Sequence, residues 1–499
     1  MRTSNMMRSI PDNAALIFEF NNDKGFYDIF NDNKLFAAVI GKQAIGELDT
    51  LRTQLLLNPL FERYFSAQNI FVSVHPSKSK PVELLLTISA ANGFETSMFE
   101  QITKQQGSGI VITPLRTTGK QGYSIYINAL KKRFYVISKE DNIFSGSFSK
   151  ELIDESAVYV NKADKKSFVL LSEQQNANSL ANLYINYSEL APLFNVLLQN
   201  KNTDLFASLK QLPGLAALSL NYRSDALMFN GSTAILSSGS PGYLSLFAAQ
   251  QPVVNHLKDI FPSTTAYSIN FAVSSPLKFA ADLEKQQSKN GLKNESGLLF
   301  TKIKAETGIS LKSRFDGLLG SEFGIVTTRY FEKLAIVSIK DGSKLKALLT
   351  DMSKMTDENS GQLNYDKVPF FLLGEPFGAF KRPYFIIIDN YLILANSAGE
   401  LTSYLDMYIN RKFLSKNDKY NQFDDLLSAQ SNAAFFFHFK NMLPIFKRDL
   451  YAKIYDIIEN DEPGWKNFYA ASLQFTAAES SLYTNFCMKL NADTVLVNK

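Results

Sequence analysis

Short apolar segments of this chain recur in the same order about 250 residues apart. Ile10–Phe20, which reads Ile-Pro-Asp-Asn-Ala-Ala-Leu-Ile-Phe-Glu-Phe, is echoed by Phe261–Phe271, which reads Phe-Pro-Ser-Thr-Thr-Ala-Tyr-Ser-Ile-Asn-Phe. A repeat of this length constrains the architecture more than local secondary-structure patterns do, because whatever one copy folds into, the other is expected to fold into as well. The chain is therefore expected to contain the same unit twice.

Further matches follow at nearly the same offset. They pair Met98–Ile102 with Leu345–Leu349, Asp141-Asn142 with Asp389-Asn390, Asn182–Tyr187 with Ala434–Phe439, and Ala217–Tyr222 with Ala470–Phe475. The alternative is that two unrelated domains rich in Phe and Leu offer similar strings. The shared order of the matches favours duplication.

These matches predict the domain organisation. We expect a polar tail at residues 1–9, where an upstream anchor has been removed, and a first α+β repeat at 10–236. A linker and lead helix at 237–260 then connect to a second α+β repeat at 261–492, and 493–499 form a tail. The richest turn-forming stretch, Ser237–Gly242, marks the boundary.

The local patterns predict an α+β fold in which each repeat is a mainly antiparallel sheet packed with several helices. Ile45, Leu48, Leu51 and Leu55 recur every three to four residues, as one buried helix face requires. Asp389-Asn390 lies between two apolar runs and predicts a tight hairpin, and the counterpart around Asp141-Asn142 predicts a longer turn. Pro192 and Pro444 are expected near helix starts.

Composition excludes several classes of protein. Hydrophobic content of 45% with 20% charged residues is typical of a globular chain. A net charge of +4 is too balanced to predict a nucleic-acid partner, and basic clusters such as Lys131-Lys132-Arg133 are interpreted as solvated loop charge. No run of about 18 apolar residues predicts a membrane span. Cys487, the only cysteine, excludes an internal disulfide and is expected on the polar face of a strand.

The sequence offers no recognisable catalytic, metal or cofactor motif. It contains three histidines, none of which has the spacing of a metal-binding helical pair. His75 precedes Pro76 and is interpreted as a turn residue, and His256 as a surface residue. His438 matches Asn186 in the repeat, so we interpret Asn186 and His438 as polar positions on the sheet faces. We predict no catalytic residue, no metal and no cofactor.

The strand opening at Ile10–Phe20, the Asp389-Asn390 hairpin with Leu392–Ser397 after it, and the Asn432–Ala434 strand resemble a bacterial family called domain of unknown function 3352. The resemblance implies a protein held at the cell envelope by an N-terminal anchor, on the periplasmic side or outer surface. It implies no activity and no catalytic residues. Since residues 1–9 are polar and contain no such anchor, we expect that the anchor has been removed from the present chain.

Two functions therefore remain open at the level of sequence. The first is a non-catalytic envelope protein that binds a protein partner or envelope component across its sheet faces or the cleft between repeats. The alternative is a carrier that holds a lipid or other hydrophobic ligand in an enclosed apolar pocket, for which the 40 phenylalanines offer suitable walls. A hydrolase would need carboxylates or a serine-centred group to converge in a cleft. The oligomeric state stays open.

Overall fold

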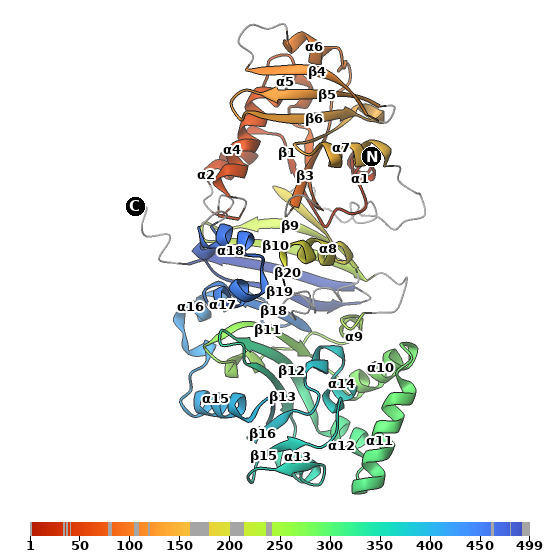
Figure 1. Cartoon of the computed structure of the whole chain (residues 1–499), viewed down its shortest axis with the longest axis vertical. Coiled ribbons are helices and arrows are strands. Elements are labelled where there is room, and N and C mark those ends of the chain that lie inside the picture. The colour runs from red at the N-terminus through yellow and green to blue at the C-terminus, as the bar shows by residue number, and fades with distance from the viewer. Residues whose placement is uncertain are drawn as a thin grey trace. The chain divides into compact units, whose positions relative to one another are not determined.

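The computed structural model describes residues 2–32, 35, 38–39, 41–77, 82–103, 109–117, 120–159, 179–199, 214–235, 242–460, 464–479 and 481–491. The chain divides into two compact units. Unit 1 comprises Met1–Lys210, Gly214–Ser232 and Leu450–Asn467, and unit 2 comprises Gln211–Pro213, Thr233–Asp449 and Phe468–Lys499. Both belong to the α+β class, as predicted (Figure 1).

The sheet of unit 1 is antiparallel throughout its described ladders. Its strands are β1 (Leu16–Asn21), β2 (Asn69–Pro76), β3 (Val82–Ser89), β4 (Ile110–Thr117), β5 (Lys120–Ile127), β6 (Lys132–Ser138), β7 (Ile143–Ser147), β8 (Ala181–Asn186), β9 (Gly214–Tyr222) and β10 (Ala226–Ile235). They pair in the order β10-β9-β8-β1-β2-β3-β7-β6-β5-β4. The first strand thus lies in the interior of the sheet, where both its edges are hydrogen-bonded.

Helices cover both faces of the unit 1 sheet. They are α1 (Arg2–Arg8), α2 (Lys24–Asp32), α4 (Lys42–Leu51), the π-helix η1 (Arg52–Leu56), α5 (Glu62–Phe65), α6 (Met98–Thr103), η2 (Glu140–Asn142), α7 (Lys150–Val158), α8 (Tyr187–Leu197), α18 (Ala452–Glu459) and η9 (Trp465–Asn467). In Figure 1, α4 lies to the left and α7 to the right, both below β6. The predicted apolar face of α4 and η1 is buried at Leu51 and Leu55.

The alternation of β6 divides the core of unit 1 into two parts. Phe134 and Val136 join the larger cluster with Leu51 and Leu55, whereas Ile137 joins Leu152 and Ile153 of α7 on the other face. Successive side chains of a strand point to opposite faces of the sheet, so one strand supports both clusters. The larger cluster also contains an aromatic group in which Phe61, Phe94 and Phe99 meet edge to face.

The strands of unit 2 are also antiparallel. They are β11 (Thr265–Ala272), β12 (Leu319–Thr328), β13 (Lys333–Ile339), β14 (Ser353–Met355), β15 (Ser360–Leu363), β16 (Tyr384–Ile388), β17 (Tyr391–Ala395), β18 (Ala433–His438), β19 (Phe468–Ala478) and β20 (Ser481–Leu490). They pair in the order β20-β19-β18-β11-β12-β13-β17-β16-β15-β14. This is the order of unit 1 with ten added to each strand number.

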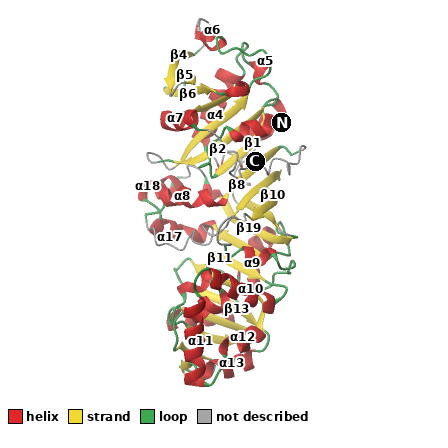
Figure 2. Ribbon diagram, turned by 90° about the vertical axis from the view of Figure 1, so that its right-hand side faces the viewer, coloured by secondary structure: helices red, strands yellow, loops and turns green. Residues whose placement is uncertain are grey.

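The helices of unit 2 occupy similar places in the chain order. They are α9 (Ser245–Ala248), η6 (Leu257–Ile260), α10 (Pro276–Lys289), α11 (Lys293–Thr307), α12 (Leu311–Leu318), α13 (Gly342–Thr350), α14 (Val368–Leu373), η7 (Glu375–Ala379), α15 (Ala398–Ile409), η8 (Leu414–Lys416), α16 (Asp418–Asp424) and α17 (Phe439–Asp449). Figure 2 shows α10, α11 and α12 gathered beside β13. Between its first two strands, unit 2 has the helices α10, α11 and α12. At the same place in the chain order, unit 1 has α2, α4 with η1, and α5.

Both predicted hairpins are confirmed. β16 and β17 pair from Ile388–Tyr391 onward, and Asp389 takes a positive φ of 51° in the turn. In unit 1 the counterpart is longer, because Glu140–Asn142 form a turn of 3₁₀ helix before β7 begins. Asp and Asn tolerate this left-handed conformation better than other residues that carry a side chain.

Two predicted segments, the polar tail at 1–9 and the lead helix before the second repeat, differ from the structure. Residues 1–9 contain the helix α1 rather than a polar tail only, because Met6 and Met7 are adjacent apolar residues that become buried. The lead at Pro252–Ile260 is helical only from Leu257, since Val253 and Val254 run extended and hydrogen-bond to the segment before β18. Residues 237–241 and 493–499 lie outside the described residues.

Other expectations need correction. The linker range is part of the unit 2 core, where Phe247 is fully buried and stacks on Phe271 with ring centroids 5.0 Å apart. Residues 450–467, predicted within the second repeat, group with unit 1. Among the described residues, none of the helices is both long and apolar enough to cross a membrane.

Pro192 and Pro444 lie inside α8 and α17, at the sixth residue of each helix, rather than at the helix starts. Each helix begins a turn earlier than predicted, directly where the preceding strand ends, and tolerates the missing backbone donor of proline. Cys487 is buried and not on a polar face. Strand β20 buries side chains on both faces, at Leu482 and at Cys487, so alternation alone misassigns the cysteine.

Candidate functional site

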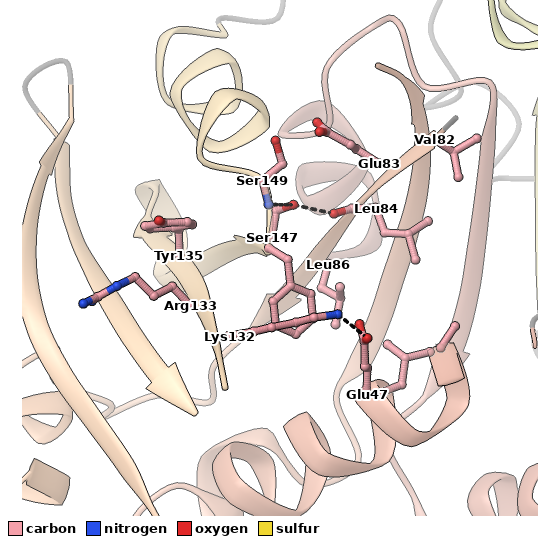
Figure 3. Close-up of a pocket in the computed structure, with 13 residues that line it drawn as sticks. Glu47, Val82, Glu83, Leu84, Leu86, Lys132, Arg133, Tyr135, Ser147 and Ser149 are labelled. Atoms are coloured by element: carbon pink, nitrogen blue, oxygen red, sulfur yellow. Dashed lines mark hydrogen bonds and ion pairs between the residues drawn. The ribbon is translucent and has the colours of Figure 1, made fainter. Parts of the chain in front are cut away.

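The candidate site of unit 1 lies where its sheet opens. The ladder between β3 and β7 runs from Ser89–Ile143 to Leu86–Gly146. Strand β7 then ends at Ser147, whereas β3 continues back to Val82. Beyond this point β3 and β6 are no longer joined by β7, and a groove lies in the gap with α4 along one side (Figure 3). We call this space the α4 groove.

The α4 groove has a volume of about 390 Å³. Its walls come from α4, β3, β6 and the residues that follow β7, namely Ala44, Glu47, Leu48, Val82, Glu83, Leu84, Leu86, Lys132, Arg133, Tyr135, Ser147, Phe148 and Ser149. Most of the surface exposed inside it is apolar. The volume falls within the range of about 300–1,000 Å³ that is typical of small-molecule sites.

The ammonium of Lys132 lies over the groove. Lys132 Nζ forms an ion pair with Glu47 Oε1 of α4 across the opening, as Figure 3 shows. The same ammonium lies 5.7 Å from the centre of the Phe148 ring. The side chain of Lys132 remains 44% exposed, so its charge is accessible from solvent. Arg133 turns away from Lys132 and donates to Ser124 Oγ at 3.3 Å.

The polar groups at the other end of the groove bind one another. Ser147 Oγ donates to the carbonyl of Leu84 at 2.7 Å and accepts from the backbone N–H of Ser149 at 3.0 Å. Ser149 in turn caps α7 by accepting from the N–H of Leu152 at 3.2 Å. These serines close the gap left by β7 with their own hydrogen bonds. The remaining wall is mainly hydrocarbon, and its other polar side chains are Glu83, Arg133 and Tyr135.

A second, smaller cavity of about 80 Å³ lies against the same helix and the π-helix η1 that follows it. It is lined by hydrocarbon side chains and one glycine: Leu51, Leu55, Leu56, Phe61, Phe65, Ile70, Leu86, Ile88, Phe99, Phe134, Val136, Phe144 and Gly146. None of the described side chains that line it is polar, so its walls offer water few hydrogen-bonding partners. We call it the inner cavity.

Phe134 of the inner cavity contacts Phe148 of the α4 groove. A Cβ atom at Gly146 would lie only 2.5 Å from Phe134 Cζ, so glycine is what allows the ring to lie on β7. The ring also meets Phe148 edge to face, with centroids 5.1 Å apart. Phe134 and Gly146 line the inner cavity, and Phe148 lines the groove.

His75 is a buried strand residue and not the turn residue predicted. It lies in β2, where its Nε2 is 2.8 Å from Ser73 Oγ and its Nδ1 is 2.7 Å from Asn13 Oδ1. Asn13 extends this series of hydrogen bonds by donating to Glu155 Oε1 at 2.8 Å. Burial lowers the pKa of His75 to about 4, so the ring is neutral at pH 7.

The serine, histidine and asparagine resemble a nucleophile with its base, but Ser73 and His75 are both completely buried. A nucleophile must reach its substrate, and neither cavity is lined by these residues. The arrangement therefore joins β2 to the segment before β1 and to α7. The sequence prediction missed it because Asn13, Ser73 and Glu155 are far apart in the chain.

Asn186 and His438 act at helix starts. Asn186 Oδ1 accepts from the N–H of Ser188 at 3.2 Å and is the N-cap of α8. His438 Nδ1 accepts from the N–H of Asn441 at 3.2 Å, in the first turn of α17. Burial and the charge of Lys440 lower the pKa of His438 to about 4, which keeps this acceptor unprotonated at pH 7. The structure does not bring Asn186 or His438 to either cavity.

Three groove residues were singled out by sequence: Leu48 on the predicted apolar helix face, and Lys132 and Arg133 in the basic cluster. Lys132 and Arg133 are exposed strand residues of β6 rather than loop residues. The signal that could have identified Lys132 is its position at the start of an apolar strand, two residues before Phe134, but its partner Glu47 lies 85 residues away. In the part of the chain that the structure describes, no group of three or more His, Cys, Asp or Glu side chains could hold a metal ion.

Comparison with known proteins adds little to this geometry. No family model matches the chain. No curated protein matches it in sequence. Among solved structures, the chain is similar to crystal form I of TP0453, with 12% identity over 47% of this chain and 79% of that one, at a TM-score of 0.25. Crystal form III of TP0453 gives 11% identity, 50% and 89% coverage, and the same TM-score. Likenesses at this TM-score carry no argument about function.

Proposed function

We propose that this protein is a non-catalytic binding protein whose α4 groove holds a small amphiphile with a hydrocarbon part and an anionic head. The observation that carries the proposal is a groove of about 390 Å³ with mainly apolar walls and the Lys132 ammonium at its opening. This proposal develops the carrier alternative from the sequence. It also gives the envelope-component hypothesis a chemical form, since many envelope components are amphiphiles.

The energetics favour such a ligand. Burying hydrocarbon contributes about 0.8 kcal/mol for each methylene removed from water. The ion pair between Lys132 and Glu47 is partly exposed, and pairs of this kind contribute only about 0–1 kcal/mol. An incoming carboxylate can therefore take Glu47's place beside Lys132 at little cost. Glu83, the other carboxylate of the groove, lies at the far end from Lys132 in Figure 3.

The test is ligand binding by the purified full chain, with laurate as the probe in isothermal titration calorimetry. Ala44→Trp places an indole in the groove and is expected to weaken laurate binding about tenfold or more, a loss of about 1.4 kcal/mol. Lys132→Gln should weaken laurate several-fold and leave lauryl alcohol unaffected, because only the carboxylate uses the ammonium.

The matched control is Gly46→Trp, on the same helix but with open space around the added side chain. It should bind laurate as the wild-type chain does. No laurate binding by the wild-type chain, together with no lipid in an organic extract analysed by mass spectrometry, would refute the proposed function. Equal laurate binding by the wild-type chain and Ala44→Trp would show that laurate binds outside the α4 groove.

We also propose an envelope location, which rests on the family resemblance alone. An amphiphile-binding protein would meet its ligand there. Expression of the natural gene in its own host, followed by separation of cytoplasmic, periplasmic and membrane fractions, tests the location. Recovery in the cytoplasmic fraction would contradict it.

The proposed duplication is supported by the strand order. Ten strands of unit 1 and ten of unit 2 pair in the same sequence of neighbours. The sequence matches fall on corresponding elements, such as Asn182–Tyr187 on β8 and Ala434–Phe439 on β18. An experimental structure of the chain tests this proposal by superposition of β1–β10 on β11–β20. Units that fail to superpose strand for strand would exclude it.

A further inference from the structure

We propose that the α4 groove and the inner cavity are two segments of one binding site, which accepts a single unbranched acyl chain, and that the ring of Phe134 is the barrier between them. The inference rests on the proposed function and adds to it the substrate class and the depth of the site. It assigns the carboxylate of a medium- or long-chain fatty acid to Lys132 and the end of its chain to the inner cavity.

The two cavities are consecutive along the same elements. The helical wall passes from Leu48 in the groove to Leu51 and Leu55 in the inner cavity. The β6 wall passes from Lys132 to Phe134, two residues further along one face of the strand. Leu86 of β3 lines both spaces, so only side-chain thickness separates them.

The helical wall of the inner cavity has an irregular turn at the residues that line the cavity. The α-helical hydrogen-bonding of α4 changes to that of a π-helix at Arg52–Leu56, which includes Leu55 and Leu56 of the cavity lining. Such wide turns are rare and occur frequently at functional sites. The turn is followed directly by Leu57 and Asn58, without an α-helical continuation.

The barrier is a single aromatic ring held by apolar contacts. Phe134 lies on Gly146 and meets Phe148 edge to face. No hydrogen bond or charge fixes a phenylalanine ring, so its rotation away from Gly146 needs no polar group to be desolvated. The Phe134 ring fills the place where a Cβ of residue 146 would stand, so this place opens to an acyl chain only when the ring rotates away.

The chemistry of the two segments determines the orientation of the ligand, that is, which of its ends lies in which segment. The inner cavity is lined by hydrocarbon alone and would leave a carboxylate without a partner, which is costly for a buried charge. The head must therefore remain at Lys132, where solvent and an ammonium are present. An inner volume of about 80 Å³, against about 390 Å³ outside, favours the end of one chain over two chains or a ring system.

The test is the dependence of affinity on chain length, measured with octanoate, decanoate, laurate, myristate and palmitate on the full chain. The wild-type protein is expected to bind about fourfold more tightly for each methylene that becomes buried, up to the length that fills both segments. Leu55→Phe fills the inner cavity. It should leave octanoate binding within about twofold of wild type and remove the gain on longer chains.

Val136→Ile, which adds one methyl group to the same wall, serves if Leu55→Phe fails to fold, as judged by circular dichroism. Ala44→Trp is the comparison, because it should weaken every chain length alike. A wild-type chain-length dependence that survives in both inner-cavity variants would overturn this inference while leaving the proposed function intact. If the wild-type chain binds none of the five acids, the proposed function fails and the inference with it.

Discussion

At the scale of single residues, His75 links three elements of unit 1 through neutral hydrogen bonds. Its ring joins Ser73 on the same strand to Asn13, which in turn donates to Glu155 of α7. The ring can accept at one nitrogen and donate at the other only while it is neutral. Protonation would place a charge in a site that offers no carboxylate directly to the ring.

His75 therefore predicts acid sensitivity. Its pKa is about 4 in the folded chain and 6.5 as a free side chain, so the unfolded state binds the proton more tightly. Stability from this group is fully present above pH 6.5, falls as the pH falls towards 4, and is constant below that. The shift corresponds to a loss of about 3 kcal/mol in the free energy of unfolding.

Urea unfolding of the wild-type chain and of His75→Gln, followed between pH 7 and pH 4, measures this loss. The variant is expected to be less stable at pH 7 but to lose about 3 kcal/mol less on acidification. His438→Gln is the control. His438 has a similarly lowered pKa in unit 2, so this variant should remove a separate part of the loss in unfolding free energy on acidification. Equal pH dependence in wild type and His75→Gln would show that His75 is protonated in the folded chain without cost.

At the scale of elements, the site arises because one strand is short. β7 has five residues, whereas its neighbours β3 and β6 have eight and seven. The gap beyond β7 becomes the α4 groove, and α4 with η1 forms its wall. The inner cavity presents hydrocarbon side chains, and a ligand that fills it removes them from water, which favours binding.

Helix α15 offers a prediction about element stability. Ser397 Oγ accepts from the N–H of Glu400 at 3.3 Å, and Glu400 Oε2 accepts from the N–H of Ser397 at 3.0 Å, so the two residues form a capping box. Ser397→Ala is expected to lower the free energy of unfolding of unit 2 by about 1 kcal/mol, because the N–H of Glu400 loses its acceptor.

Thermal or urea unfolding, monitored by hydrogen exchange in α15, gives the measurement. Ser403→Ala, inside the same helix, is the matched control and should be neutral or slightly stabilising, because alanine is the better helix former. A Ser397→Ala chain with unchanged exchange at the start of α15 would contradict the role of the cap.

At the scale of the whole molecule, the chain returns to unit 1 after building most of unit 2. Residues 450–467 belong to unit 1, where Leu450 bridges to Leu198 and the N–H of Tyr451 donates to the carbonyl of Leu197 at 3.2 Å. Leu198 is completely buried. Unit 1 therefore depends on a segment that lies more than 200 residues further along the chain.

A fragment of residues 1–235 is expected to be less stable than unit 1 in the full chain, because it lacks the segment that pairs with Leu198. Hydrogen exchange at the end of α8 should be faster in the fragment, and a peptide of residues 450–467 added in trans should slow it. A peptide of the same composition in scrambled order is the control. Native-like exchange in the fragment alone would show that the returning segment contributes no stability.

Features that depend on residues near one another in the chain were predicted correctly, whereas features that depend on residues far apart in the chain were missed. The Asp389-Asn390 hairpin is confirmed because turn residues and flanking apolar runs are local. The face of α4 is confirmed for the same reason, since the spacing of Leu51 and Leu55 suffices. The buried environment of His75 was missed, because its partners Asn13 and Ser73 meet it only through strand pairing and the preceding loop.

The sequence by itself determined the α+β class, the buried face of α4 and the hairpin turns, because each depends on residue spacing within a few turns or one hairpin. Only the tertiary structure decided that β7 stops short between β3 and β6, that Lys132 meets Glu47, and that Phe134 lies on Gly146. These contacts depend on the register between strands and on how a helix packs on a sheet. Neither is written in the local pattern of apolar and polar residues.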